Sequence, residues 1–183
     1  MTKNFNNTIY FYLMTDRFFS DFSNYDEFER KSNRGHGVIS FAINNELLAI
    51  PLRSSLSPKL INARHLFPYK VYQKANGNKY LKALDLSKLM FIKEYHVNQT
   101  IEYFFQDPNE KQFYIKNINR IYTRTKNYIG TYIKICNKID QGKEIQKYEL
   151  KKYRYSTLRN FHSKLGIPIS KQAFIEALKN NNY

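Results

Sequence analysis

The stretch RGHGVISFAINNELLAIPLRSS, residues 34–55, decides the fold that we predict for this chain. Towards the end of residues 35–43, apolar side chains alternate between the two faces expected of a strand. Residues 46–52 form a second apolar run, so each segment is expected to be a strand. The pair Asn44-Asn45 tolerates positive φ, which predicts a hairpin turn between the two strands. Residues whose numbers add up to about 89 are therefore expected to face one another across the hairpin.

This register brings a set of polar side chains to one end of the hairpin. Arg53 is expected opposite His36, with Ser54 next to it, and Arg34 is expected opposite Ser55. Such a set suits RNA cleavage without a metal, in which the ribose 2′-hydroxyl attacks its own phosphate. A base takes the hydroxyl proton, an acid protonates the leaving oxygen, and cations stabilise the phosphorane. We predict His36 as the proton-transfer group, and Arg34, Arg53 and Ser54 as groups that bind the phosphate.

The two glycines beside His36 allow the backbone at Gly35 and Gly37 to approach a ligand closely. The alternative interpretation is a plain turn before a strand, in which His36 is merely exposed.

The rest of the chain predicts an α+β fold with the sheet built early and the helices late. The apolar positions between Ile118 and Ile139 recur at spacings of three and four, which indicates one face of a long helix. Pro51 is expected at a sheet edge or beside a bulge. The further predicted strands are residues 8–14, 67–73, 79–84 and 89–95, and the predicted helix caps are Thr15, Asp107, Ser156 and Ser170.

Length and composition fit one domain over residues 1–183, β-rich in residues 1–97 and helical and basic in residues 98–183. The chain carries 30 Lys and Arg against 15 Asp and Glu, a formal net charge of +15. Between Lys111 and Lys164 there are 14 Lys and Arg and three acids, so the positive charge is concentrated in the second half. Because like charges on one surface repel, a polyanionic partner is the first expectation, with a solvated helix surface as the alternative.

Tyrosine and phenylalanine alternate with these basic residues, as in residues 69–72 and 148–155. This pattern suits single-stranded RNA, because bases stack on aromatic rings while cations follow the backbone. The residues predicted to bind RNA are Ser55, Lys59, Arg64, Lys116, Arg120, Arg124, Lys151, Lys152, Arg154 and Arg159.

Several classes of protein are not supported. The chain has one cysteine, four separated histidines and no phosphate-binding glycine motif, so we expect no cofactor and no metal site. No secretory signal and no apolar run of membrane-spanning length is visible, so we expect a cytoplasmic protein without a membrane partner.

The residues around the hairpin resemble a known family. A basic residue that opens a strand, followed by the hairpin and then Ala49-Ile50-Pro51-Leu52-Arg53-Ser54, is similar to the endoribonuclease toxins of type III toxin–antitoxin systems. These are the ToxN/AbiQ, CptN and TenpN group, and the CptN branch is the most similar. By position, Arg34 falls on the family's strand-opening Lys, and Arg53-Ser54 falls on its Thr-Ser pair. Leu56 and Arg30 differ from the family's Lys and Tyr, and His36 is our candidate to replace the missing base.

The resemblance implies an antiparallel, barrel-like core related to the MazF/Kid toxins, with long basic helices packed around it. It also implies metal-independent cleavage of single-stranded target mRNA that leaves a 2′,3′-cyclic phosphate. A folded, repeated RNA antitoxin would inhibit the enzyme by binding in its basic groove, forming a closed protein–RNA assembly. The alternative is a non-catalytic RNA-binding regulator. A DNA-binding regulator has less support, because no helix-turn-helix pattern is present.

Overall fold

The structure is a computed structural model that describes residues 9–27, 37–43 and 46–180. Its strands are β1 (Tyr10–Met14), β2 (Gly37–Ile43), β3 (Glu46–Leu56), β4 (Leu66–Gln73), β5 (Lys79–Asp85), β6 (Met90–Phe91) and β7 (Val97–Glu102). Its α-helices are α1 (Asp16–Asp21), α2 (Pro108–Lys116), α3 (Ile118–Asp140), α4 (Lys147–Lys151) and α5 (Lys171–Asn180). Short 3₁₀ turns are η1 (Pro58–Leu60), η2 (Leu86–Lys88), η3 (Glu94–His96) and η4 (Thr157–Asn160). The fold is α+β, as predicted.

The described strands form one antiparallel sheet of seven strands in the order β4-β5-β3-β2-β1-β7, with β6 paired to β3. The outer strands are β4 and β7, so this sheet is not closed into a barrel. The predicted strand over residues 89–95 is wrong beyond Phe91, because the chain leaves β6 and enters η3.

The register predicted for the hairpin is confirmed. Val38 pairs with Pro51 and Ile43 pairs with Glu46, so each pair adds up to 89. The expected turn, residues 44–45, lies outside the described residues. β3 continues beyond the predicted end at Leu52 because it changes neighbours there: it pairs with β6 at Leu48 and Ala49 and with β5 from Leu52 onward. Pro51, which has no N–H group to donate, lies between these two pairings.

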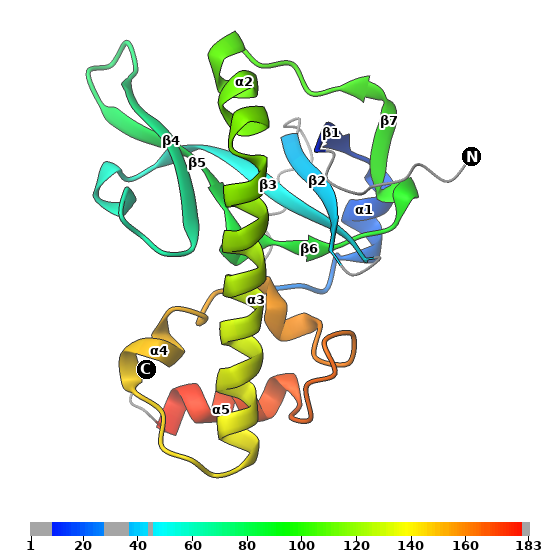
Figure 1. The fold of residues 1–183 in the computed structure, drawn as a ribbon, viewed down its shortest axis with the longest axis vertical. Helices are drawn as coiled ribbons and strands as arrows, with labels where there is room; N and C mark the ends of the chain where they lie inside the picture. The colour runs from blue at the N-terminus through cyan, green and yellow to red at the C-terminus, as the bar shows by residue number, and fades with distance from the viewer. Residues whose placement is uncertain (1–8, 28–36, 44–45, 181–183) are drawn as a thin grey trace.

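Helix α3 joins the two parts of the molecule. Figure 1 shows it running along the long axis, with the sheet around its first half and α4 and α5 beside its second half. Its buried face includes Ile121, Thr125, Tyr132 and Cys136, which confirms the predicted spacing. The predicted cap Asp107 begins a separate helix, α2, which ends at Asn117 just before α3 begins. None of the described helices is long and apolar enough to cross a membrane.

A buried carboxylate ties the N-terminal part of the chain to the C-terminal part. The Glu27 side chain is 1% exposed and accepts hydrogen bonds from Arg159 and, at 2.8 Å, from Asn160. The Lys171 ammonium lies 3.3 Å away. Burial alone would raise the pKa of Glu27, but the Asn160 hydrogen bond and the two cations outweigh burial, and the pKa lies below its ordinary value of 4.5.

We expect Glu27→Gln to lower the free energy of unfolding at pH 7 by about 3–5 kcal/mol, because it removes the buried charge that pairs with Arg159 and Lys171. Because the folded-state pKa is lowered, this stabilisation is present above about pH 4.5 and is lost as the pH falls through the folded-state pKa. Urea unfolding of both proteins between pH 3 and pH 7 measures the difference. Glu144→Gln is the control, because Glu144 is exposed. Equal losses in the two variants would contradict this role of Glu27.

Candidate functional site

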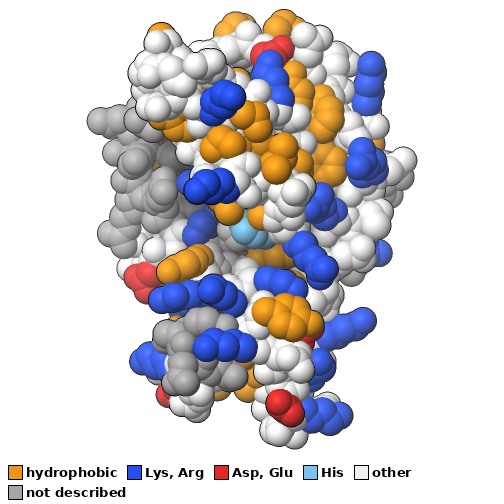
Figure 2. Space-filling view, turned by 90° about the vertical axis from the view of Figure 1, so that its left-hand side faces the viewer, with side chains coloured by type: hydrophobic (Ala, Val, Ile, Leu, Met, Phe, Trp, Pro, Cys, Tyr) orange, Lys and Arg blue, Asp and Glu red, His pale blue; other side chains and the backbone are white. Residues whose placement is uncertain are grey.

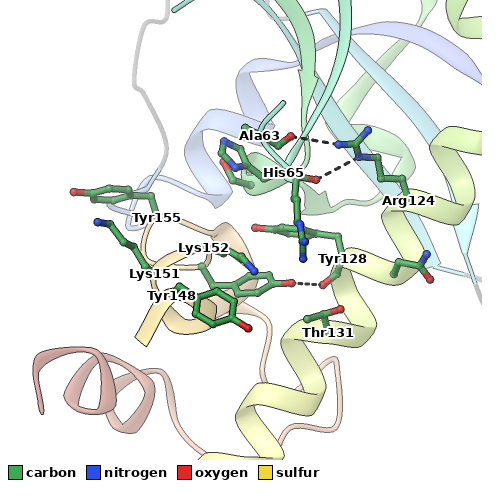
Figure 3. A pocket seen from close by; sticks show the side chains of 13 residues that line it. Ala63, His65, Arg124, Tyr128, Thr131, Tyr148, Lys151, Lys152 and Tyr155 are labelled. Carbon is green, nitrogen blue, oxygen red and sulfur yellow. Dashed lines mark hydrogen bonds between the residues drawn. The ribbon is translucent and has the colours of Figure 1, made fainter. Parts of the chain in front are cut away.

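A pocket of about 820 Å³ lies where the sheet, α3 and the α4 region meet. Figure 3 shows its three walls: the segment of Ala63 and His65 before β4, the α3 residues Arg124, Tyr128 and Thr131, and the α4 region with Tyr148, Lys151, Lys152 and Tyr155. We call it the basic pocket, and its remaining lining residues are Arg64, Ser87, Asn127 and Tyr153.

The basic pocket collects cations from three separate parts of the chain. Arg64, Arg124, Lys151 and Lys152 all line it, and all were predicted to bind RNA. Among the described lining residues there is no aspartate or glutamate. Figure 2 shows the same region as a hollow with a histidine inside and Lys and Arg side chains around it. The pocket is therefore suited to an anionic ligand.

Arg124 holds one wall of the pocket in place. Its Nε donates to the Arg64 carbonyl and its Nη2 donates to the Ala63 carbonyl, both at 3.3 Å. Burial, and then repulsion from Arg120 one turn earlier, lowers the pKa of the Arg124 guanidinium, which stays charged. This arrangement places two like charges on one helix face, where an anion would relieve their repulsion.

His65 is the titratable side chain of the pocket that is best placed for proton transfer. Burial lowers its pKa below the ordinary value of 6.5, Asp85 acts in the opposite direction, and the cations Arg124 and Lys88 lower it further. The imidazole is consequently neutral at pH 7 and able to accept a proton. His65 was not among the predicted site residues, although its neighbour Arg64 was among the predicted RNA-binding residues.

The predicted catalytic cluster is described in part. Arg34 and His36 lie outside the described residues. Arg53 faces the buried Asp85, with Nη1 and Oδ2 3.8 Å apart. The same carboxylate accepts hydrogen bonds from the backbone N–H and the hydroxyl of Ser87, a lining residue of the basic pocket. Asp85 therefore links Arg53 to Ser87 of the pocket, and its charge raises the pKa of His65 against the effect of burial.

Ser54 and Ser55 lie at an irregularity of β3. The pairing with β5 shifts by one residue between Arg53 and Leu56, which is a β-bulge, and both serines are exposed there. The Tyr72 hydroxyl donates to the Ser54 carbonyl. Bulges redirect side chains, so this one turns the two serines toward solvent.

At Gly37 the missing side chain does not serve the approach of a ligand that the sequence predicted. A Cβ atom at this position would lie 2.5 Å from the Tyr103 ring, so the missing side chain makes room for a ring of the protein itself. Gly35 lies outside the described residues.

The other predicted RNA-binding residues are spread over the surface. Arg120 lines a shallow hollow of about 410 Å³ that adjoins the basic pocket through Arg124 and Asn127. Lys59 and Lys116 are exposed, and so is Arg154, whose guanidinium lies 5.1 Å from the Tyr155 ring centre. Arg159 differs from them, because its side chain is only 12% exposed and its guanidinium forms an ion pair with Glu27 inside the fold.

Within the described part of the chain, no three His, Cys, Asp or Glu side chains come together as possible metal ligands. Neither a protein-family model nor a curated protein matches the chain.

We expect the basic pocket to bind single-stranded polyanions with a strong dependence on salt. For single strands, the logarithm of the binding constant falls with the logarithm of the salt concentration by about 0.7 per neutralised phosphate. Arg64→Gln and Lys152→Gln should each make this slope shallower by about 0.7, as measured by fluorescence anisotropy of a labelled oligonucleotide. Lys93→Gln removes one charge from an exposed side chain outside the pocket and should leave the slope unchanged. Equal slopes for all variants would contradict the assignment of the pocket.

Proposed function

We propose that this chain is an endoribonuclease that cleaves single-stranded RNA without a metal cofactor. The observation that carries the proposal is His65, a neutral imidazole in a cavity lined by Arg64, Arg124, Lys151 and Lys152. A base among phosphate-binding cations is the set of groups that RNA cleavage by its own 2′-hydroxyl requires. We therefore assign the role of general base to His65 instead of to His36, the residue predicted from the sequence.

In the proposed reaction, the substrate phosphate lies among the cations of the basic pocket. His65 takes the proton of the ribose 2′-hydroxyl, and the 2′-oxygen forms a bond to the adjacent phosphorus. The bond from phosphorus to the 5′-oxygen breaks, and the departing oxygen takes a proton from a lysine ammonium of the pocket. Arg64 and Arg124 stabilise the charge of the phosphorane, and the product is a 2′,3′-cyclic phosphate.

We further propose that the enzyme is the toxin of a type III toxin–antitoxin system. Three features support this assignment: the hairpin register, the Arg53-Ser54 sequence at its end, and the basic surface from Arg120 to Lys152. The family resemblance implies a barrel-like, MazF/Kid-related core and a folded RNA antitoxin bound in the basic groove. Since the described sheet is open, the assignment depends on the hairpin and the pocket rather than on closure of a barrel.

We expect the purified protein to cleave single-stranded RNA in the presence of EDTA. His65→Ala should lower the cleavage rate by about 10²- to 10⁴-fold while RNA affinity is retained, because general acid–base catalysis supplies an acceleration of this order. Gel electrophoresis of end-labelled RNA measures both quantities. His36→Ala is the matched comparison.

Three results would count against the proposal. Loss of activity with chelator would contradict cleavage without a metal. Full activity of His65→Ala together with an inactive His36→Ala would place the chemistry outside the basic pocket. RNA binding without any cleavage would support the non-catalytic regulator.

The cleavage rate should also depend on pH in a defined direction. Because the pKa of His65 lies below 6.5, the neutral base predominates at pH 7, and the rate should be flat from pH 7 to pH 8. It should fall below pH 6.5, as the imidazole becomes protonated. Single-turnover rates at constant ionic strength measure this profile, and a rate that rises as the pH is lowered from 7 to 5 would exclude His65 as the base.

A further inference from the structure

Two of the tyrosines that line the basic pocket are exposed to solvent rather than packed into the core. Tyr148 is 59% exposed and Tyr155 is 61% exposed. Tyr128 and Tyr153 line the same pocket but are 7% and 3% exposed, and their rings pack against each other with centres 4.8 Å apart. The pocket therefore has an inner, buried pair of rings and an outer, solvent-facing pair.

A cationic side chain lies next to each outer ring. The Lys152 ammonium lies 4.6 Å from the Tyr148 ring centre, and the Arg154 guanidinium lies 5.1 Å from the Tyr155 ring centre. A ring that accepts a base, beside a cation that accepts a phosphate, is the unit from which sites for unpaired nucleotides are built.

The segment that carries these rings is anchored at two points, Tyr153, which lies between them in sequence, and Tyr155. The Tyr153 hydroxyl donates to the Tyr128 carbonyl at 2.9 Å, which fixes the segment to α3. The Lys88 ammonium donates to the Tyr155 carbonyl at 3.0 Å, which fixes it to η2. An anchored backbone loses little conformational freedom when a ligand binds, so less free energy is lost when the two rings stack on bases.

The two rings lie on one wall of the pocket, and Figure 3 shows Lys151 drawn between them. The cavity of about 820 Å³ lies within the usual range for binding sites, roughly 300–1,000 Å³.

We propose that Tyr148 and Tyr155 stack on the two unpaired bases that flank the phosphate held at His65. This inference rests on the proposed function and makes it more specific, because the smallest recognised unit is a single-stranded dinucleotide step. A base held in a duplex is covered on both faces by its neighbours and does not present a free face to either ring. The two tyrosines thereby select unpaired RNA.

The test is the affinity of the protein for a short single-stranded RNA that carries 2′-O-methyl groups, so that no cleavage occurs. Base–aromatic stacking contributes about 1–3 kcal/mol per base, so Tyr148→Ala and Tyr155→Ala should each weaken binding by about 5- to 150-fold. Tyr148→Phe and Tyr155→Phe keep the ring and should bind within about twofold of the wild type. Phe104→Ala removes a ring that is 82% exposed outside the pocket and should have no effect.

Oligonucleotides with abasic sites show whether a substitution weakens binding by removing base stacking or by changing the structure of the pocket. If Tyr148 stacks on one base, removal of that base should abolish the effect of Tyr148→Ala, and the same should hold for Tyr155 with the neighbouring base. Alanine variants that bind as well as the wild type, losses that persist with abasic RNA, or a wild type that does not bind the oligonucleotide would each overturn the inference. A protein that shows this base-dependent binding but cleaves no RNA would contradict the proposed function and leave the stacking site in place.

Discussion

The buried face of α3 is the constraint on which the rest of the structure depends. Tyr122, in its first half, packs on Phe41 of the sheet, while Tyr132, in its second half, packs on Phe174 of α5. A helix of 23 residues covers both parts because its apolar positions keep one face over its whole length. The basic pocket lies at the junction of these two parts, so its shape follows from the packing of α3.

The electrostatics of the pocket follow from the same packing. Arg124 points from α3 to the carbonyls of Ala63 and Arg64, and these two hydrogen bonds hold the segment that carries His65 against the helix. Holding several cations around one hollow costs free energy unless an anion enters. Arg159 differs from the cations of the pocket, because it donates a hydrogen bond to the buried carboxylate of Glu27. Asn160 donates to the same carboxylate, and these contacts stabilise the fold. The cation Arg159, with its carboxylate partner, maintains the fold, whereas Arg124 is bonded to backbone carbonyls and lines the pocket.

Sequence reasoning was accurate where a pattern is local. The hairpin register followed from two asparagines and an alternating run, and α3 followed from its spacing. The position of His65 could not be found in this way, because the segment before it is held by Arg124, whose guanidinium bonds to the Arg64 carbonyl 60 residues away, and no local pattern marks that contact. The pairing of Arg159 with Glu27 spans 132 residues and was missed for the same reason. Long-range pairing of this kind is decided by tertiary packing rather than by local propensity.

The central claim is that RNA is cut by its own 2′-hydroxyl in the basic pocket, and the chemistry of the product ends tests it most directly. Mass spectrometry of RNA treated with the purified protein distinguishes the two possible sets of ends. The account predicts a 2′,3′-cyclic phosphate on one fragment and a 5′-hydroxyl on the other. Fragments with a 3′-hydroxyl and a 5′-phosphate would contradict it, because they arise when water rather than the ribose attacks the phosphorus.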